Sequence, residues 1–114
     1  MKQIKAFMRR ELLGSTINEL QINGARDITV THVDAIGNLS DFEMDRWHIL
    51  RRYQETYSTI AKLEIVCRDD EARTFVDVIK EHGHTGERGD GRVFVMPVEL
   101  TANITTGEEG EDAL

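Results

Sequence analysis

The stretch T-G-E-R-G-D-G-R-V-F-V, residues 85–95, joins a glycine-rich loop directly to an apolar strand. Gly86, Gly89 and Gly91 permit backbone angles that other residues avoid, so consecutive amides can turn inward and form a concave cradle for an anion such as phosphate. The alternative is that the three glycines only connect a helix to a strand. The segment therefore predicts a helix, loop and strand in succession, and a candidate phosphate-binding loop.

Four segments of the chain have the pattern of β-strands. Residues 2–9 and 60–67 alternate apolar and polar side chains, and residues 28–33 are mostly β-branched. Residues 93–98 form the fourth predicted strand, and Pro97 indicates that its far end lies at a sheet edge or leaves the ladder.

Two further segments have helical periodicity. Apolar residues recur at intervals of three and four over residues 11–23, and Gly24 stands where a helix normally ends. Asp69 and Asp70 are positioned to cap a second helix, which ends at Gly83. The order strand, helix, strand, strand, helix, strand predicts an α+β, ferredoxin-like βαββαβ sandwich. One face of such a sheet has no helix, and we expect self-association to cover it.

Composition restricts the possible functions of this single domain, residues 1–114. The chain carries 14 basic and 21 acidic residues, a net charge of -7, which disfavours nucleic-acid binding. Its longest apolar run, residues 93–98, is far shorter than the ~20 residues that a spanning helix needs, so no membrane insertion is expected. The single cysteine, Cys67, excludes an internal disulfide and indicates a reducing, cytoplasmic compartment.

The strand order, the loop at residues 85–95 and the closing T-G-E-E-G-E-D-A-L together resemble the PII signal-transduction family. The resemblance implies a cytoplasmic homotrimer of ferredoxin-like subunits that binds an adenine nucleotide (ADP, AMP or ATP) in clefts between subunits. Members of that family act on a target through a long mobile loop. By position, the family's T-loop corresponds to residues 37–59, its B-loop to residues 83–91 and its C-loop to residues 101–114.

The resemblance also implies roles for individual nucleotide-binding residues. Adenine, ribose and base contacts fall on two strands, the entry to the T-loop falls on a glycine, and phosphate contacts fall on the B-loop and the basic residue after it. An arginine at the last position can make a forked, charge-assisted pair with phosphate oxygens. Thr29 lies at the position of an adenine contact, Glu64 at that of a ribose contact and Val66 at that of a base contact. Gly37 stands at the entry to the T-loop. The phosphate contacts correspond to Gly89, Asp90 and Gly91, and the basic residue after them is Arg92.

Four positions depart from the family pattern. Asn103 and Thr105 stand where two C-loop arginines usually hold the outer phosphates, which favours ADP or AMP over ATP. Leu39 and Ile60 stand where a glutamine and a lysine help to bind magnesium and 2-oxoglutarate. We therefore expect no 2-oxoglutarate sensing, and the sequence leaves Mg²⁺ binding open.

The T-loop segment is also unusual, because residues 38–59 contain neither glycine nor proline. A capping-box pattern at its start and a four-residue repeat of large apolar residues predict a third helix over about residues 41–57. Aromatic and arginine side chains are common anchors of interfaces. The alternative is that these side chains pack on the protein's own sheet. The predicted partner-binding residues are Trp47, Arg51, Arg52 and Tyr53, and the setting of Tyr53 does not match a modification site.

Other chemistry has weaker support. His82 and His84 supply only half of a metal site, and we predict none. No set of residues suggests a catalytic nucleophile, so we expect no enzyme activity, and slow ATP hydrolysis is a distant third hypothesis. The main alternatives are a trimeric interaction scaffold that binds no nucleotide, and a regulator of an inorganic-carbon transporter with bicarbonate as co-ligand. A membrane transporter is one candidate for the target protein, and the sequence does not choose among candidates.

Overall fold

A computed structural model of the chain describes residues 1–37 and 57–114. Six main elements follow the predicted order of strand, helix, strand, strand, helix, strand, and a short 3-10 helix lies before the first α-helix and at the end of the chain. Their bounds are β1 Lys2–Met8, η1 Arg10–Leu12, α1 Leu13–Ile22, β2 Ile28–Ile36, β3 Tyr57–Cys67, α2 Asp69–Gly83, β4 Gly91–Pro97 and η4 Gly110–Ala113.

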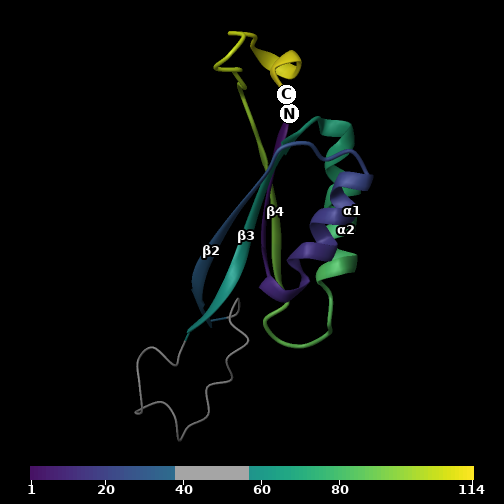
Figure 1. Cartoon of the computed structure of the whole chain (residues 1–114), viewed down its shortest axis with the longest axis vertical. Coiled ribbons are helices and arrows are strands. Elements are labelled where there is room, and N and C mark those ends of the chain that lie inside the picture. The colour runs from purple at the N-terminus through teal and green to yellow at the C-terminus, as the bar shows by residue number, and fades with distance from the viewer. Residues whose placement is uncertain (38–56) are drawn as a thin grey trace, which may run out of the picture.

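The four strands form one antiparallel sheet in the order β2-β3-β1-β4. Both α-helices cover the same face of this sheet, as Figure 1 shows. This is the topology of a ferredoxin-like α+β sandwich, so the predicted fold class is confirmed. No helix within residues 1–37 or 57–114 is long and apolar enough to cross a membrane.

The core lies between the helices and the inner face of the sheet. Alternate residues of the two central strands point into it, which is why their sequences alternate, and the helices contribute large apolar side chains. Burying one such side chain contributes about 1.5–3 kcal/mol relative to leaving it exposed. The largest fully buried side chains are Phe75, Ile4, Met8, Leu20, Leu63, Ile65 and Thr16.

The first helix ends where predicted but begins later. Gly24 has a φ of 96°, and the amides of Gly24 and Ala25 donate to the carbonyls of Gln21 (3.0 Å) and Leu20 (2.9 Å), which closes the helix C-terminus. At the other end, residues 10–12 form the 3-10 turn η1, so the α-helix begins at Leu13 rather than at residue 11. A 3-10 turn of this kind is common at a helix N-terminus.

The start of the second helix corrects another prediction. Asp69 and Asp70 do not precede the helix as caps but form its first turn, where negative charge is favourable beside the exposed amides. The residue before the helix is Arg68, and its amide donates to the Glu71 carboxylate at 3.0 Å. This contact satisfies the amide of the residue before the helix, so it differs from the cap expected of the aspartates, which would accept from amides inside the first turn.

Strands β2 and β3 are longer than predicted, running to Ile36 and from Tyr57 rather than over residues 28–33 and 60–67. The polar pair Asp34 and Thr59 obscured the pattern, yet these residues face each other across the two strands. The Thr59 hydroxyl donates to the Asp34 carboxylate at 3.1 Å, so the pair stabilises the ladder where strand propensity is low.

The sheet face opposite the helices carries a mixture of apolar and charged side chains. Phe7 and Phe94 lie on this open face with their rings edge to face, at a centroid separation of 6.2 Å and an interplanar angle of 84°. Phe94 remains 44% exposed, and Val66 is exposed on the same face. An apolar area of this kind favours association.

Candidate functional site

The glycine loop connects α2 to β4 at the end of the sheet where β1 ends (Figure 1). Three of its residues have positive φ angles, which are 86° at Gly86, 95° at Gly89 and 111° at Gly91. Side chains at these positions would be strained, so the loop requires glycine for its shape whatever it binds.

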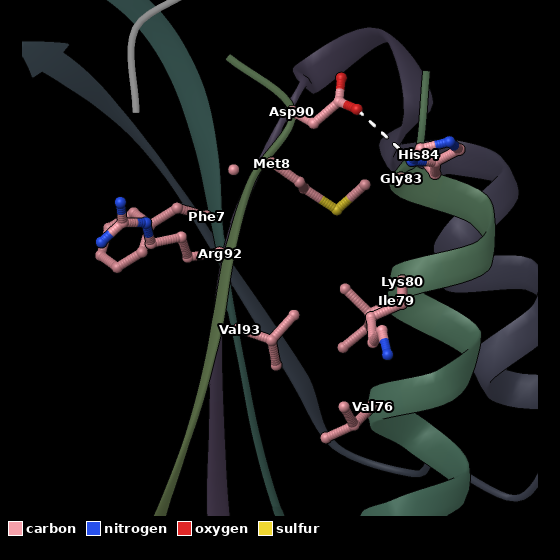
Figure 2. Close-up of a pocket in the computed structure, with 11 residues that line it drawn as sticks. Phe7, Met8, Val76, Ile79, Lys80, Gly83, His84, Asp90, Arg92 and Val93 are labelled. Carbon is pink, nitrogen blue, oxygen red and sulfur yellow. Dashed lines mark ion pairs between the residues drawn. The ribbon is translucent and has the colours of Figure 1, made fainter. Parts of the chain in front are cut away.

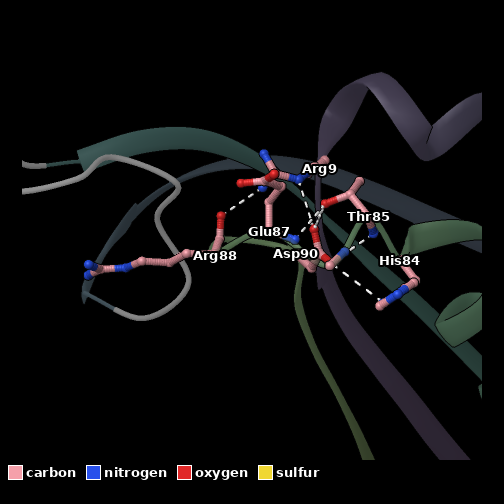
Figure 3. Close-up of polar contacts among 7 residues, drawn as sticks. Arg9, His84, Thr85, Glu87, Arg88 and Asp90 are labelled. Carbon is pink, nitrogen blue, oxygen red and sulfur yellow. Dashed lines mark hydrogen bonds and ion pairs between the residues drawn. The ribbon is translucent and has the colours of Figure 1, made fainter.

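Asp90 organises the loop from within. Its Oδ2 atom accepts hydrogen bonds from the amides of Thr85 (2.8 Å) and Gly86 (2.9 Å), and its Oδ1 atom accepts one from the Thr85 hydroxyl (Figure 3). The amide of Glu87 donates to the same Thr85 hydroxyl oxygen at 3.1 Å. The loop is therefore folded around one of its own carboxylates.

Arg9, directly after β1, ties this loop to the sheet. Its Nε atom donates to Asp90 Oδ1 at 3.0 Å, and its Nη2 atom donates to the Arg88 carbonyl at 2.7 Å. Sequence reasoning missed Arg9, which lies about 80 residues away along the chain. The signal was present, because a ferredoxin-like sheet pairs the first strand antiparallel with the last, so the end of one lies beside the start of the other.

These contacts set the charge state of Asp90. Desolvation raises the pKa of its carboxyl group, but hydrogen bonds from the side chain and amide of Thr85, the amide of Gly86 and the side chain of Arg9 outweigh it and leave the pKa far below its ordinary value. Asp90 is an anion at neutral pH. His84 Nδ1 lies 3.8 Å from Asp90 Oδ2 and adds a weaker, protonation-dependent contact.

The internal hydrogen bonds narrow the predicted phosphate cradle. The amides of residues 85, 86 and 87 already donate to Asp90 and Thr85. The segment left for a phosphate is the one after residue 87, in which Gly89 is itself buried within the chain and the side chain of Arg92 is exposed. The contribution of Asp90 to such a site would be to shape the loop rather than to contact the anion, since two negative groups repel.

Gly91 has a clear structural role. A Cβ atom at this position would lie 1.7 Å from the Phe7 carbonyl oxygen, because β4 begins directly against β1. Its predicted role in phosphate binding stays a prediction.

Two different surfaces flank the start of β4, as Figure 2 shows. The side chain of Arg92 lies beside Phe7 on the open face of the sheet, opposite to it in the β1 and β4 register. On the helix side, a groove of about 310 Å³ lies between α2 and β4, with Val76, Ile79 and Val93 among the residues that line it. The groove is mostly apolar, so the exposed Arg92 side chain is the better phosphate partner.

Two of the predicted base and ribose contacts lie together on the open face of the sheet. Thr29 and Glu64 are opposite each other in β2 and β3, and the Thr29 hydroxyl approaches the Glu64 carbonyl at 3.5 Å. The Glu64 carboxylate accepts a hydrogen bond from Gln3 Nε2 at 2.8 Å and lies 3.5 Å from Lys62 Nζ. Val66 is two residues further along β3 on the same face, and its side chain is exposed.

Within one chain, the glycine loop is distant from this second cluster. Val66 in β3 lies opposite Gln3 of β1, and Gly91 in β4 lies opposite Met8 of β1. The two positions are therefore five residues apart along β1 and two strands apart across the sheet. At about 3.4 Å per residue and about 4.8 Å per strand spacing, Val66 and Gly91 are roughly 20 Å apart. A single ribose, which is all that separates a base from its first phosphate, cannot bridge that gap.

Gly37 and the partner-binding residues belong to a third region. Gly37 directly follows β2 and has a φ of 86°, which suits the entry to a loop. The predicted third helix over residues 41–57 and the predicted partner-binding residues lie outside the described residues, except for Tyr57 at the start of β3. The predicted partner-binding residues are Trp47, Arg51, Arg52 and Tyr53.

The C-terminal segment folds into a small hairpin in which Ala102 bridges to Glu109. The Asn103 side-chain oxygen accepts hydrogen bonds from the amides of Thr105 (2.9 Å) and Thr106 (3.1 Å), so it closes the turn. Figure 1 shows this hairpin at the end of the sheet opposite to the glycine loop. Residues 101–114 of one chain therefore cannot meet its own glycine loop.

Metal-binding side chains are not clustered in the part of the chain that the structure describes. Residues 1–37 and 57–114 contain no group of three or more His, Cys, Asp or Glu side chains with the spacing of a metal site. Cys67 is buried, and both burial and the nearby Glu71 carboxylate raise the pKa of its thiol, so it is a core residue with little thiolate character.

Comparison with known proteins adds independent evidence. The family model described as nitrogen regulatory protein P-II matches residues 1–108. The chain is 36% identical over 115 residues to nitrogen regulatory protein P-II 2 of Methanothermobacter thermautotrophicus, covering 100% of this chain and 97% of that protein. It is 32% identical over 114 residues to nitrogen regulatory protein GlnK2 of Haloferax mediterranei, covering 100% of this chain and 91% of that protein. Nitrogen regulatory protein P-II of Azospirillum brasilense is 32% identical over 116 residues, with both chains covered completely.

Proposed function

This chain belongs to the nitrogen regulatory P-II family, and we propose that it is a trimeric, cytoplasmic signalling protein that binds an adenine nucleotide between neighbouring subunits. Membership makes it a regulatory protein and not an enzyme. Proteins of this family generally bind adenine nucleotides, and they are trimers that regulate target proteins. The ligand, the assembly and the target of this chain are the parts that we propose.

One observation carries the proposal, namely that the glycine loop lies too far from the predicted base contacts Val66 and Thr29 to hold one nucleotide within a chain. A site made of both halves needs two copies. The loop of one subunit then supplies Gly89 and Arg92 to the phosphates, and the open sheet face of its neighbour supplies Thr29, Glu64 and Val66 to the nucleoside. The exposed apolar side chains of that face support association of copies.

The nucleotide that suits this site best is ADP or AMP. Asn103 uses its side-chain oxygen within its own turn and has no positive charge, and Thr105 has none either. Each missing charge-assisted contact would contribute about 1.5–3 kcal/mol to binding. Without these contacts, a third phosphate adds little binding free energy at this site. We therefore expect ADP and AMP to bind at least as tightly as ATP, with Mg²⁺ adding little.

We also propose that 2-oxoglutarate does not bind. Residue 60, which lies opposite Val33 in the sheet and is only 4% exposed, is an isoleucine, so its own side chain offers no charge where a lysine is expected. Leu39, the other departure, lies outside the described residues. Calorimetric titration of 2-oxoglutarate into the nucleotide-loaded protein should give no heat, and tight binding would refute this part of the proposal.

Calorimetry with ATP, ADP and AMP tests the nucleotide site directly. Arg92→Gln should weaken ADP by about tenfold or more, since it removes a charged partner of the phosphates. Arg73→Gln is the matched control, because Arg73 pairs with Asp77 on the exposed surface of α2 and should leave ADP binding unchanged. Equal affinities in the two variants would contradict the role of Arg92.

Mixed assemblies test whether the site is shared. Glu64→Ala damages only the nucleoside half and Arg92→Gln damages only the phosphate half, so each variant alone should bind ADP poorly. When the two variants are unfolded, mixed and refolded together, a fraction of the interfaces combines two intact halves and should recover wild-type affinity. Failure to recover any tight site, with trimers formed normally, would place both halves in one chain.

A specific observation also favours the second candidate, a trimeric scaffold that binds no nucleotide. The Asp90 carboxylate already accepts hydrogen bonds from the amides of Thr85 and Gly86, so these amides do not donate to a phosphate. Asn103 and Thr105 supply no positive charge for one. An absence of heat with all three nucleotides would support the scaffold. In either case we propose that residues 38–59, with Trp47, Arg51, Arg52 and Tyr53, contact the target. The first target to test is an inorganic-carbon transporter, with bicarbonate as co-ligand.

A further inference from the structure

One side chain holds the glycine loop on both sides of Gly89. Arg9 donates through Nη2 to the carbonyl of Arg88, the residue before Gly89, and through Nε to the carboxylate of Asp90, the residue after it (Figure 3). The Arg9 side chain is only 12% exposed, and the Asp90 side chain is 23% exposed. A partly desolvated, charge-assisted contact of this kind is stronger than a surface ion pair.

We propose that Arg9 is a positioning residue for the phosphate end of the nucleotide, acting by fixing the peptide at Gly89. The inference rests on the proposed function, because Gly89 is the glycine of the predicted cradle that remains once residues 85–87 have donated internally. Gly89 is buried within the chain, so a phosphate can reach its peptide only if the loop is held in one arrangement. Glycine with a φ of 95° has wide conformational freedom when unrestrained. Restraining it before binding reduces the entropy that a ligand must remove.

The two ends of the contact differ in how much they depend on Arg9. Asp90 is also held by the amides of Thr85 and Gly86, so its carboxylate stays in place without Arg9. The hydrogen bond to the Arg88 carbonyl comes from Arg9 itself. Removing Arg9 should therefore loosen the peptide at Gly89 while the Thr85 and Gly86 part of the loop keeps its shape.

The contact also requires arginine rather than a generic cation. The planar guanidinium directs Nε and Nη2 to two acceptors at once, whereas a lysine ammonium is a single point charge on a flexible stem. Arg9→Lys should keep the electrostatic attraction to Asp90 and lose the hydrogen bond to the Arg88 carbonyl. Its effect on binding should accordingly fall between the wild type and Arg9→Gln.

The test compares Arg9→Gln, Arg9→Lys and the control Arg10→Gln, which removes the same charge from the exposed neighbouring residue. Affinities for ADP and for adenosine are measured by calorimetry, and amide exchange is followed by NMR in the ligand-free protein. We expect Arg9→Gln to weaken ADP binding about tenfold and to leave adenosine binding unchanged. In the ligand-free variant, ¹⁵N relaxation should show a lower backbone order parameter at Gly89, while the amides of Thr85 and Gly86 keep their protection from exchange. Arg10→Gln should change none of these.

The outcomes separate the inference from the function on which it rests. If the unaltered protein binds neither ligand, the proposed function fails and the inference fails with it. If the unaltered protein binds ADP and Arg9→Gln binds it equally well, the inference alone is overturned. A parallel loss of ADP and adenosine affinity, or loss of protection at Thr85 and Gly86, would show that Arg9 only maintains the loop fold, and would also overturn it.

Discussion

Gly91 lies so close to Phe7 that a Cβ atom on it would stand 1.7 Å from the Phe7 carbonyl oxygen and 3.2 Å from the Cα of Met8. Because the obstruction is backbone of the central strand β1, it cannot move without breaking the sheet. Gly91→Ala should therefore destabilise the protein by about 3 kcal/mol or more. Urea unfolding followed by circular dichroism measures this loss.

Gly86→Ala is the control for that prediction. Its φ of 86° is also positive, but the nearest atom to an added Cβ is a His84 ring atom at 3.8 Å. Only the backbone strain of about 1–2 kcal/mol should then appear. Equal losses in the two variants would mean that backbone strain, and not the contact with Phe7, makes glycine necessary at residue 91.

The carboxylate of Asp90 should make stability depend on pH in the acid range. Its pKa is lowered in the folded protein, so its stabilising contribution is complete above about pH 4, the ordinary value for aspartate, and is lost as the pH falls through the lowered value. Asp90→Asn should reduce the free energy of unfolding by about 2 kcal/mol at pH 7. The difference from wild type should shrink steadily below about pH 4.

The matching control is Asp77→Asn on the outer face of α2. Asp77 pairs with Arg73 at 2.8 Å, but both side chains are exposed, so the effect should be below about 0.5 kcal/mol at any pH. Denaturant titrations at pH 7 and pH 3 compare the two variants. A constant difference for Asp90→Asn across this range would contradict the assigned pKa direction.

Self-association should depend on the open face of the sheet. Phe94 packs edge to face on Phe7 and is 44% exposed, so replacing it with a charged residue should affect assembly more than the fold of one chain. We expect Phe94→Glu to shift sedimentation from trimer towards monomer while the circular dichroism spectrum is kept. Ile22→Glu, at an exposed site at the end of α1, should leave the trimer intact, and dissociation by both variants alike would argue against the open face as the interface.

Cys67 should react slowly with thiol reagents. It is buried in the core, and burial together with the Glu71 carboxylate raises the pKa of its thiol, so both access and thiolate fraction are low. At pH 8 the native protein should react with an aromatic disulfide reagent at least about a hundredfold more slowly than the urea-unfolded protein. Rapid labelling of the native protein would place Cys67 outside the core.

Residue patterns predicted most of the fold because its periodicities are local. The alternation over β1 and the three-and-four spacing around Leu20 reflect which side chains face a shared core, and that core forms as expected. The misplaced starts of the two helices are local errors, but the ends of β2 and β3 depend on a long-range partner. Asp34 is a poor strand residue alone, and in β2 it lies opposite Thr59, whose hydroxyl donates to its carboxylate.

For the candidate site, the sequence by itself determined which residue types were present: a glycine loop, an arginine after it, and no cations at residues 103 and 105. Only the tertiary structure decided how they are used. Pairing of β1 with β4 brought Arg9 to Asp90 and Phe7 to Gly91, and sheet order separated Thr29 from the loop. The reason is physical, because side-chain period depends on a few neighbouring residues, whereas contacts between segments about 80 residues apart exist only once the strands have paired.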